Sequence, residues 1–291
     1  MRLSCITGML LLMLVMILGG CGSGQKDDRA AIAVSFEPQA WILKQIAGDD
    51  FDIVTLIPSK SDPETYQPSV STMKNLGQAK VYFTLGTPGF EESMGRSISS
   101  NFPNLMIEDA AEGITRIYGT HSDHSHDDGN EPSGFDPHML TSIRNCIIMA
   151  DNMTETLAEL YPENEDRYRE QNRRLKEDLR ALDDSISGLS LRDKSIVVRH
   201  PILSYFAHDY GIRQLSLETD GKEPSPMQIM KMTEEIKEAD PVMMVADKSS
   251  TSDRDAETAK QLGLEMMEVS LNSADWLNNL RRIAHEIDRT R

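Results

Sequence analysis

The stretch that decides the fold is ENEDRYREQNRRLKEDLRALDDSI, residues 163–186, near the middle of a chain of 291 residues. More than half of its residues are charged, and its apolar residues recur at helical spacing in one narrow stripe: Tyr168, Leu175, Leu179, Leu182 and Ile186. Pro162 occupies a favourable first helical position, acidic residues fill the first turn, and Ser187-Gly188 ends the pattern. About 25 residues of helix span roughly 37 Å. We therefore predict a long polar helix that packs along two halves of the protein.

Short apolar runs bounded by turn residues flank this helix on both sides and alternate with helix-like stretches. The predicted strands before it are Ala31–Phe36, Ile53–Pro58, Val81–Leu85 and Leu105–Ile107. Those after it are Ser195–Val198, Gln214–Leu217, Val242–Val245 and Met267–Ser270. This alternation indicates βα units and parallel sheets. The predicted fold class is α/β, with two βα lobes that carry parallel sheets, one long rigid helix that joins them, and a cleft between the lobes.

The same pattern predicts how the chain is divided. The expected parts are an N-terminal lobe over residues 31–140, a helical linker over 141–190 that includes the long connecting helix, and a C-terminal lobe over 191–291. Within the linker, Thr141–Leu160 is predicted to be one helix. Ligands of such sheets lie outside the carboxyl ends of the strands. We therefore look for chemistry directly after the strands.

Polar side chains that ligate metals stand at four strand ends or helix starts. Glu64 follows the Ile53–Pro58 strand, and His138 precedes the Thr141 helix. His200 and Asp247 directly follow strands of the second half. Two imidazoles and two carboxylates converging on a cleft suit zinc, and manganese accepts the same set with added oxygens. Each residue alone has a structural interpretation as well, as a helix-start acid, a cap, a core histidine or a turn former.

Four segments give the chain a strong resemblance to the metal-binding lipoprotein component of bacterial ABC importers for zinc or manganese. They are residues 34–92, FDPHML at 135–140, RHPILSYFAHDYGIRQLSLE at 199–218 and LEMMEVSLNSADW at 264–276. The resemblance covers nearly the whole chain after its first thirty residues. It implies two lobes joined by a long helix, one divalent ion held between them, and delivery of that ion to an ABC permease. It also implies binding without catalysis, so we expect no enzyme.

The resemblance implies a ligand set as well. The family's first histidine corresponds to Glu64 here, the second to His138 and the third to His200. The family's fourth ligand, usually an aspartate, falls at Asn272, with Asp275 close behind. A carboxylate at position 64 preserves ligation and adds negative charge, whereas an amide is a weak ligand. Asp247 or a water molecule could therefore supply the fourth position.

A polar insert precedes the FDPHML segment. Residues 120–129, THSDHSHDDG, hold three histidines and three aspartates and contain no apolar residue. A segment of this composition cannot bury itself and is expected to be a loop. We interpret His121, His124 and His126 as an auxiliary metal loop, because similar loops occur at this place in zinc-type relatives. Imidazole ligands favour zinc, since manganese prefers oxygen. The expected ion is Zn²⁺, with Mn²⁺ as the alternative.

The N-terminus has the features of an export signal and an anchor. Arg2 precedes the unbroken apolar run Met9–Leu18, which is too short to span a bilayer comfortably and fits a secretory signal over residues 1–20. Leu18-Gly19-Gly20-Cys21 resembles a lipobox, so Cys21 is expected to carry lipid at the start of a tether over residues 21–30. A cleaved signal with an accidental cysteine is the alternative. Only Cys146 then remains in the body of the chain, which leaves no intramolecular disulfide.

Charge and composition restrict the partners. With 30 Lys and Arg against 47 Asp and Glu, the formal net charge is −17, which argues against binding to nucleic acid. We expect a monomer, exported and lipid-anchored to a bacterial membrane, that faces the periplasm or the cell exterior. Two other functions stay open: a metal-binding adhesin or buffering lipoprotein without a transport partner, and an exported zinc hydrolase. We find no nucleophile-plus-base motif for the latter, and we interpret Tyr205-Phe206 and Trp276 as packing residues.

Overall fold

The fold is described from a computed structural model. The structure describes residues 29–61, 63, 66–118, 134–218 and 226–290. Contacts divide the chain into two compact units, Met1–Ala30 and Ala31–Arg291, and the second holds nearly all the described residues. Among the helices of these described ranges, none has both the length and the apolarity needed to cross a bilayer.

The first half is a four-stranded sheet with the strand order β2-β1-β3-β4. Its strands are β1 (Ala30–Val34), β2 (Phe51–Thr55), β3 (Ala79–Thr84) and β4 (Met106–Asp109). Its helices are α2 (Glu37–Ala47), α3 (Val70–Leu76) and α4 (Phe90–Asn101). The β1–β3 and β3–β4 pairs are parallel, so the carboxyl ends of these strands lie at one edge.

The second half repeats this plan with the strand order β6-β5-β7-β8. Its strands are β5 (Ser195–Val198), β6 (Arg213–Ser216), β7 (Met243–Asp247) and β8 (Met266–Val269), and all three adjacent pairs are parallel. Its helices are α7 (Ser204–Tyr210), α8 (Pro226–Ala239), α9 (Asp253–Leu262) and α10 (Trp276–Arg289). Strand β5 is fully buried, which is typical of the centre of a parallel sheet.

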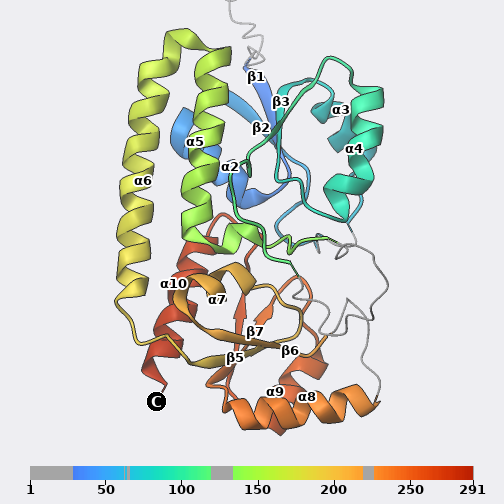
Figure 1. The fold of residues 1–291 in the computed structure, drawn as a ribbon. Helices are drawn as coiled ribbons and strands as arrows, with labels where there is room; N and C mark the ends of the chain where they lie inside the picture. The colour runs from blue at the N-terminus through green and yellow to red at the C-terminus, as the bar shows by residue number, and fades with distance from the viewer. Residues whose placement is uncertain (1–28, 62, 64–65, 119–133, 219–225, 291) are drawn as a thin grey trace, which may run out of the picture. The chain divides into compact units, whose positions relative to one another are not determined.

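The connection between the halves is a pair of helices, α5 (Ile143–Leu160) and α6 (Glu165–Ser187), separated by the short 3₁₀ helix η2 (Pro162–Asn164). Figure 1 shows them side by side along one flank, and α6 contacts both α2 of the first half and α10 of the second. The predicted apolar stripe of α6 is buried along its whole length. The α/β class, the two parallel sheets and the long helix predicted from the sequence are therefore confirmed.

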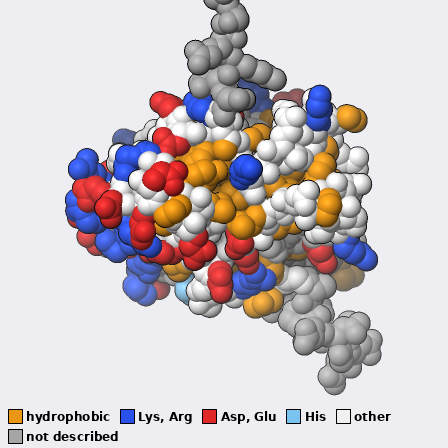
Figure 2. Space-filling model, turned by 90° about the horizontal axis from the view of Figure 1, so that it is seen from above, with side chains coloured by type: hydrophobic (Ala, Val, Ile, Leu, Met, Phe, Trp, Pro, Cys, Tyr) orange, Lys and Arg blue, Asp and Glu red, His pale blue; other side chains and the backbone are white. Residues whose placement is uncertain are grey.

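The outer face of α6 carries charges of both signs. Arg169 pairs with Glu155 and Glu165, and Arg173 pairs with Glu170 and Glu177. Figure 2 shows acidic and basic side chains gathered at the left of the view, the side on which α5 and α6 lie in Figure 1. Exposed pairs of this kind each contribute only a few tenths of a kcal/mol. The buried stripe, rather than the surface charges, therefore holds α6 in place.

The helix predicted over Thr141–Leu160 begins later than expected. The chain first forms the 3₁₀ helix η1 (Met139–Thr141), and Ser142 then adopts extended backbone and caps α5. The Ser142 side chain accepts a hydrogen bond from the Asn145 amide at 3.1 Å, which satisfies a free N–H of the first helical turn. The predicted helix over Thr141–Leu160 thus begins two residues later, and His138 lies just before η1.

Side chains of α10 join the two halves. The Trp276 ring is fully buried and meets the Trp41 ring of α2 edge to face, with centroids 5.2 Å apart. Its indole Nε1 donates to the carbonyl oxygen of Leu140 at 3.1 Å. The packing role predicted for Trp276 is therefore correct, and its N–H adds a hydrogen bond to the segment that follows His138.

Candidate metal centre

A cleft of about 540 Å³ lies between the carboxyl-end loops of the two sheets. Its polar lining includes His138, Arg199, His200, Glu218, Asp247 and Asn272. Apolar residues of the first half, among them Phe36 and Phe90, form much of the opposite wall. The cleft thus has the position that the strand pattern predicted, outside the carboxyl ends of the strands.

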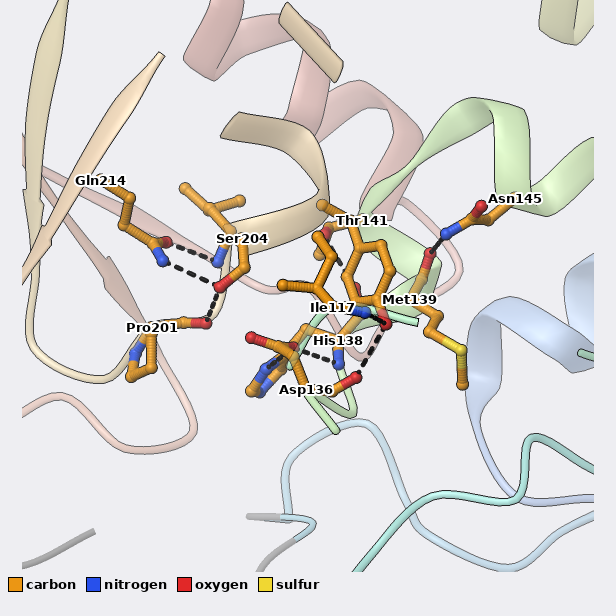
Figure 3. Close-up of polar contacts among 11 residues, drawn as sticks. Ile117, Asp136, His138, Met139, Thr141, Asn145, Pro201, Ser204 and Gln214 are labelled. Atoms are coloured by element: carbon orange, nitrogen blue, oxygen red, sulfur yellow. Dashed lines mark hydrogen bonds and ion pairs between the residues drawn. The ribbon is translucent and has the colours of Figure 1, made fainter. Parts of the chain in front are cut away.

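His138 is oriented by the carboxylate two residues before it. The Oδ1 atom of Asp136 accepts a hydrogen bond from the His138 amide at 2.8 Å and lies 2.9 Å from His138 Nδ1 (Figure 3). Asp136 is 1% exposed, whereas the His138 ring is about a fifth exposed. A carboxylate on Nδ1 leaves Nε2 of the ring as the atom available to a metal.

The charge of Asp136 is maintained by its surroundings. Burial raises the pKa of this carboxyl, but the adjacent His138 and hydrogen bonds from His138 and Ser204 outweigh that effect and hold the pKa at about 2. Asp136 is therefore ionised at neutral pH. A charged acceptor on Nδ1 makes the imidazole a stronger electron donor to a cation at Nε2.

Backbone hydrogen bonds fix the segment that carries this histidine. The Asp136 amide donates to the Ile117 carbonyl at 2.8 Å, next to an isolated antiparallel bridge between Tyr118 and Phe135. On the other side, the Thr141 amide and hydroxyl both donate to the His138 carbonyl, at 3.0 and 2.8 Å. The backbone on both sides of the ring is thus hydrogen-bonded.

His200 follows β5 directly and lies in a second well-bonded loop. The Ser204 hydroxyl donates to the Pro201 carbonyl at 3.0 Å, and Gln214 of β6 bonds both Ser204 and the Leu203 amide. Glu218 Oε2 lies 3.8 Å from His200 Nδ1, and its other oxygen lies 3.3 Å from Arg199 Nε. Arg199 also donates to the buried Asp255 at 3.1 Å. An arginine bonded on two sides therefore holds a carboxylate beside His200.

The structure brings the two predicted imidazoles together. The ring centroids of His138 and His200 are 5.2 Å apart, with planes inclined at 66°. Their side chains are 22% and 14% exposed, so both are largely shielded yet line the cleft. Zinc takes imidazole nitrogens at about 2.0–2.1 Å, so two ligating rings must come this close.

Asp247 lies at the end of β7, as predicted, and lines the cleft. Its Oδ1 accepts hydrogen bonds from the Ser249 amide and hydroxyl at 2.8 and 2.6 Å, and its Oδ2 accepts from the Leu271 amide at 2.9 Å. The carboxylate therefore connects β7 to the loop that follows β8. Oδ1 already accepts two hydrogen bonds and Oδ2 accepts one, so Oδ2 keeps a lone pair that is compatible with a ligand role.

Asn272 bonds across the cleft. Its Oδ1 accepts from the Glu37 amide at the start of α2 at 3.2 Å, and its Nδ2 donates to the Pro58 carbonyl at 3.4 Å. The amide side chain is suited to this position because it accepts at one atom and donates at the other, which a carboxylate cannot do. Asp275 lies further out, exposed, and accepts from Asn278 at 3.3 Å.

Several predicted site residues lie outside the described residues: Glu64, Cys21 and the loop residues His121, His124 and His126. Within the described ranges, no three His, Cys, Asp or Glu side chains come close enough to hold an ion. The described part of the site is therefore an imidazole pair rather than a full coordination sphere. Cys146 lies apart from the cleft: it is fully buried, and burial raises the pKa of its thiol to about 12.

Sequence reasoning missed three residues that shape the site. Asp136 lies in FDPHML and is given no role from the sequence alone. Aspartate side chains commonly accept a hydrogen bond from the backbone amide two residues later, as Asp136 does from His138. Arg199 and Glu218 are charged residues that the sequence places 19 positions apart, at the two ends of the segment 199–218. Arg199 and Glu218 pair because β5 and β6 are adjacent strands of the sheet. The sequence of the segment does not show that these two strands are adjacent.

Comparisons with known proteins give one consistent result. A family model described as zinc-uptake complex component A, periplasmic, matches residues 32–289. A protein of Chlamydia trachomatis serovar D is 28% identical over 280 residues, covering 94% of this chain and 97% of that protein. The zinc-binding lipoprotein AdcA of Streptococcus pneumoniae serotype 4 is 25% identical over 227 residues, covering 73% of this chain but only 44% of AdcA. A crystal structure of ZnuA matches with a TM-score of 0.80 at 28% identity, covering 90% of this chain and 99% of that one.

The cross-cleft bonds of Asn272 predict a stability effect. Asn272→Ala removes both hydrogen bonds to the first half and should lower the free energy of unfolding of the metal-free protein by about 1 kcal/mol, because two solvent-accessible bonds contribute weakly. Urea denaturation in the presence of a chelator measures the change. Asn278→Ala is the matched control, since the Asn278 side chain donates to Asp275 at the start of the same helix rather than to the first half. Equal losses in the two variants would contradict the cross-cleft role.

Proposed function

The chain belongs to the family of zinc-uptake complex component A, periplasmic, and we propose that it captures Zn²⁺ between His138, His200 and Glu64 and delivers it to an ABC permease. Membership makes the chain a metal-binding solute-binding protein rather than an enzyme, as the sequence predicted. The choice of ion, the ligand set and the permease partner belong to the proposal. The observation that carries it is the pair of imidazoles 5.2 Å apart in the cleft.

The donor set favours zinc over manganese. Two imidazoles and one carboxylate, with the fourth position left to Asp247 or water, form a mixed nitrogen and oxygen set of the size that zinc accepts in four-fold geometry. Manganese prefers oxygen ligands and would need oxygens in addition to those of this set. The negative charge of the ionised Asp136 beside His138 adds attraction for a divalent cation without occupying a coordination position.

The geometry suggests how capture proceeds. His138 and His200 line the side of the cleft formed by the second sheet and its neighbouring segments, and Glu64 follows β2 in the sequence of the first half. An ion bound to the imidazole pair would gain its carboxylate from a residue of the first half, so that binding would draw the two halves together. The family's delivery of metal to an ABC permease then supplies the next step, release at the membrane.

The anchor and the auxiliary loop complete the proposal. Cys21, at the end of the lipobox-like Leu18–Cys21, would hold the protein at the membrane by acyl chains after export. The name of the relative AdcA as a zinc-binding lipoprotein supports both the lipid and the ion. His121, His124 and His126 would collect zinc weakly, because imidazole nitrogens and the neighbouring carboxylates are zinc ligands.

Removal of either imidazole tests the ligand set. His138→Ala and His200→Ala should each weaken Zn²⁺ binding by at least about 100-fold, more than the 10- to 100-fold that loss of an outer partner costs. Competition titration against a zinc chelator measures the affinity, with Mn²⁺ titrated in parallel to establish the preference. His208→Ala is the control, because His208 lies on α7 with 76% of its side chain exposed. Zinc affinity unchanged in the two cleft variants would refute the assignment.

Loss of the modified cysteine tests the anchor. Cys21→Ser should move the exported protein from the membrane fraction to the soluble fraction, because the acyl chains are attached through its thiol. Fractionation with metabolic labelling by a palmitate analogue measures both the location and the lipid. Cys5→Ser is the control, since Cys5 precedes the cleavage site and should leave labelling intact. Full labelling of the Cys21→Ser protein would rule out this site.

A further inference from the structure

We propose that Tyr205 is a positioning residue of the metal site, whose hydroxyl fixes the His138 segment to the helix that follows His200 and so sets the spacing of the two imidazoles. This inference rests on the proposed function, because it concerns the same ion. It assigns Tyr205 a role beyond the packing predicted from its sequence context.

The Tyr205 hydroxyl both donates and accepts a hydrogen bond, one with the His138 segment and one with the described segment that ends at Tyr118. The hydroxyl donates to the Asp136 carbonyl at 3.1 Å and accepts from the Ile117 amide at 3.2 Å. Tyr205 is 3% exposed, so water does not compete effectively for these bonds. Asp136 and Ile117 also bond each other, because the Asp136 amide donates to the Ile117 carbonyl. One hydroxyl therefore joins two backbone strands at the point where the His138 segment begins.

The tyrosine is also closely linked to His200. It lies in the first turn of α7, five residues after His200, and the intervening Pro201–Ser204 is held by the Ser204 bond to Pro201. Gln214 of β6 fixes the same turn from the neighbouring strand. A shift of Tyr205 would therefore move the loop that carries His200.

The link to the His138 ring is equally short. The backbone carbonyl of Asp136 accepts a hydrogen bond from the Tyr205 hydroxyl, and its carboxylate bonds the His138 ring. A single residue, Asp136, therefore connects the hydroxyl to the imidazole. The Trp276 bond to Leu140 holds the other side of the same segment. The two imidazoles are thus attached to one structural body that includes α7 and α10. Preorganised ligands bind an ion without first having to be ordered, which increases affinity.

A single hydroxyl deletion with a matched control tests the inference. Tyr205→Phe keeps the ring and removes both bonds, and we expect its Zn²⁺ affinity to fall about 10-fold, at the lower end of the range for lost outer partners. Tyr210→Phe is the control, because Tyr210 is also buried on α7 and its hydroxyl donates to Asp183 of α6 at 2.8 Å, outside the cleft lining. It should bind zinc within twofold of the unchanged protein, although both variants lower the Tm.

The visible absorption bands of the Co²⁺-loaded protein give a second measurement, which a loss of stability alone would not change. Co²⁺ loaded into the unchanged protein and into Tyr210→Phe should give the same bands, whereas Tyr205→Phe should shift them because the angle between the imidazoles changes. Unchanged zinc affinity and an unchanged cobalt spectrum in Tyr205→Phe would overturn the inference while leaving the proposed function intact. An equal loss of affinity in Tyr210→Phe would also overturn it. If the unchanged protein binds no zinc, the proposed function fails first and the inference with it.

Discussion

The contact between the Asp136 carboxylate and the His138 ring is the interaction on which the site depends. Oδ1 of Asp136 bonds both the backbone amide and the ring Nδ1 of His138. The main chain and the side chain of this histidine are therefore held by the same atom. An ionised carboxylate can remain at a buried position when its oxygens are hydrogen-bonded, and His138, the residue that it orients, supplies such bonds from its amide and its ring. The Nε2 atom of His138 is thereby left for a metal before the other residues of the cleft are considered.

The rest of the fold brings the second histidine to the first. Parallel sheets place the residues after β5 and β7 at one edge, so His200 and Asp247 arrive at the cleft as a consequence of topology. The long helix α6 packs on α2 and α10 along its buried stripe, and Trp276 adds an aromatic contact with Trp41 across the halves. The two sides of the cleft are therefore joined by apolar burial away from the cleft and by the hydrogen bonds of Asn272 at its edge.

The sequence predicted the sheets and both imidazoles because these follow from local patterns. Apolar runs bounded by turn residues mark strands such as Ser195–Val198, whose predicted bounds are those of β5, and polar residues after such runs mark the ligand edge. The residues that hold the ligands depend on distant partners. Asn272 bonds residues 235 and 214 positions away, and Tyr205 bonds the backbone 69 and 88 positions away. The period of a helix or strand does not reveal pairings over such distances. From the sequence alone, Asn272 is therefore interpreted as a weak ligand and Tyr205 as a packing residue, and their hydrogen bonds are missed.

X-ray absorption at the zinc K edge, on protein loaded with one equivalent of zinc, tests the central claim most directly. The account predicts a first shell of two imidazole nitrogens with low-Z oxygen donors at about 2.0–2.2 Å, including the multiple-scattering signal of the imidazole rings. The His138→Ala protein should retain the signal of one ring. A six-coordinate shell of oxygens without imidazole scattering would contradict the account, because the two histidines of the cleft would then not bind the ion.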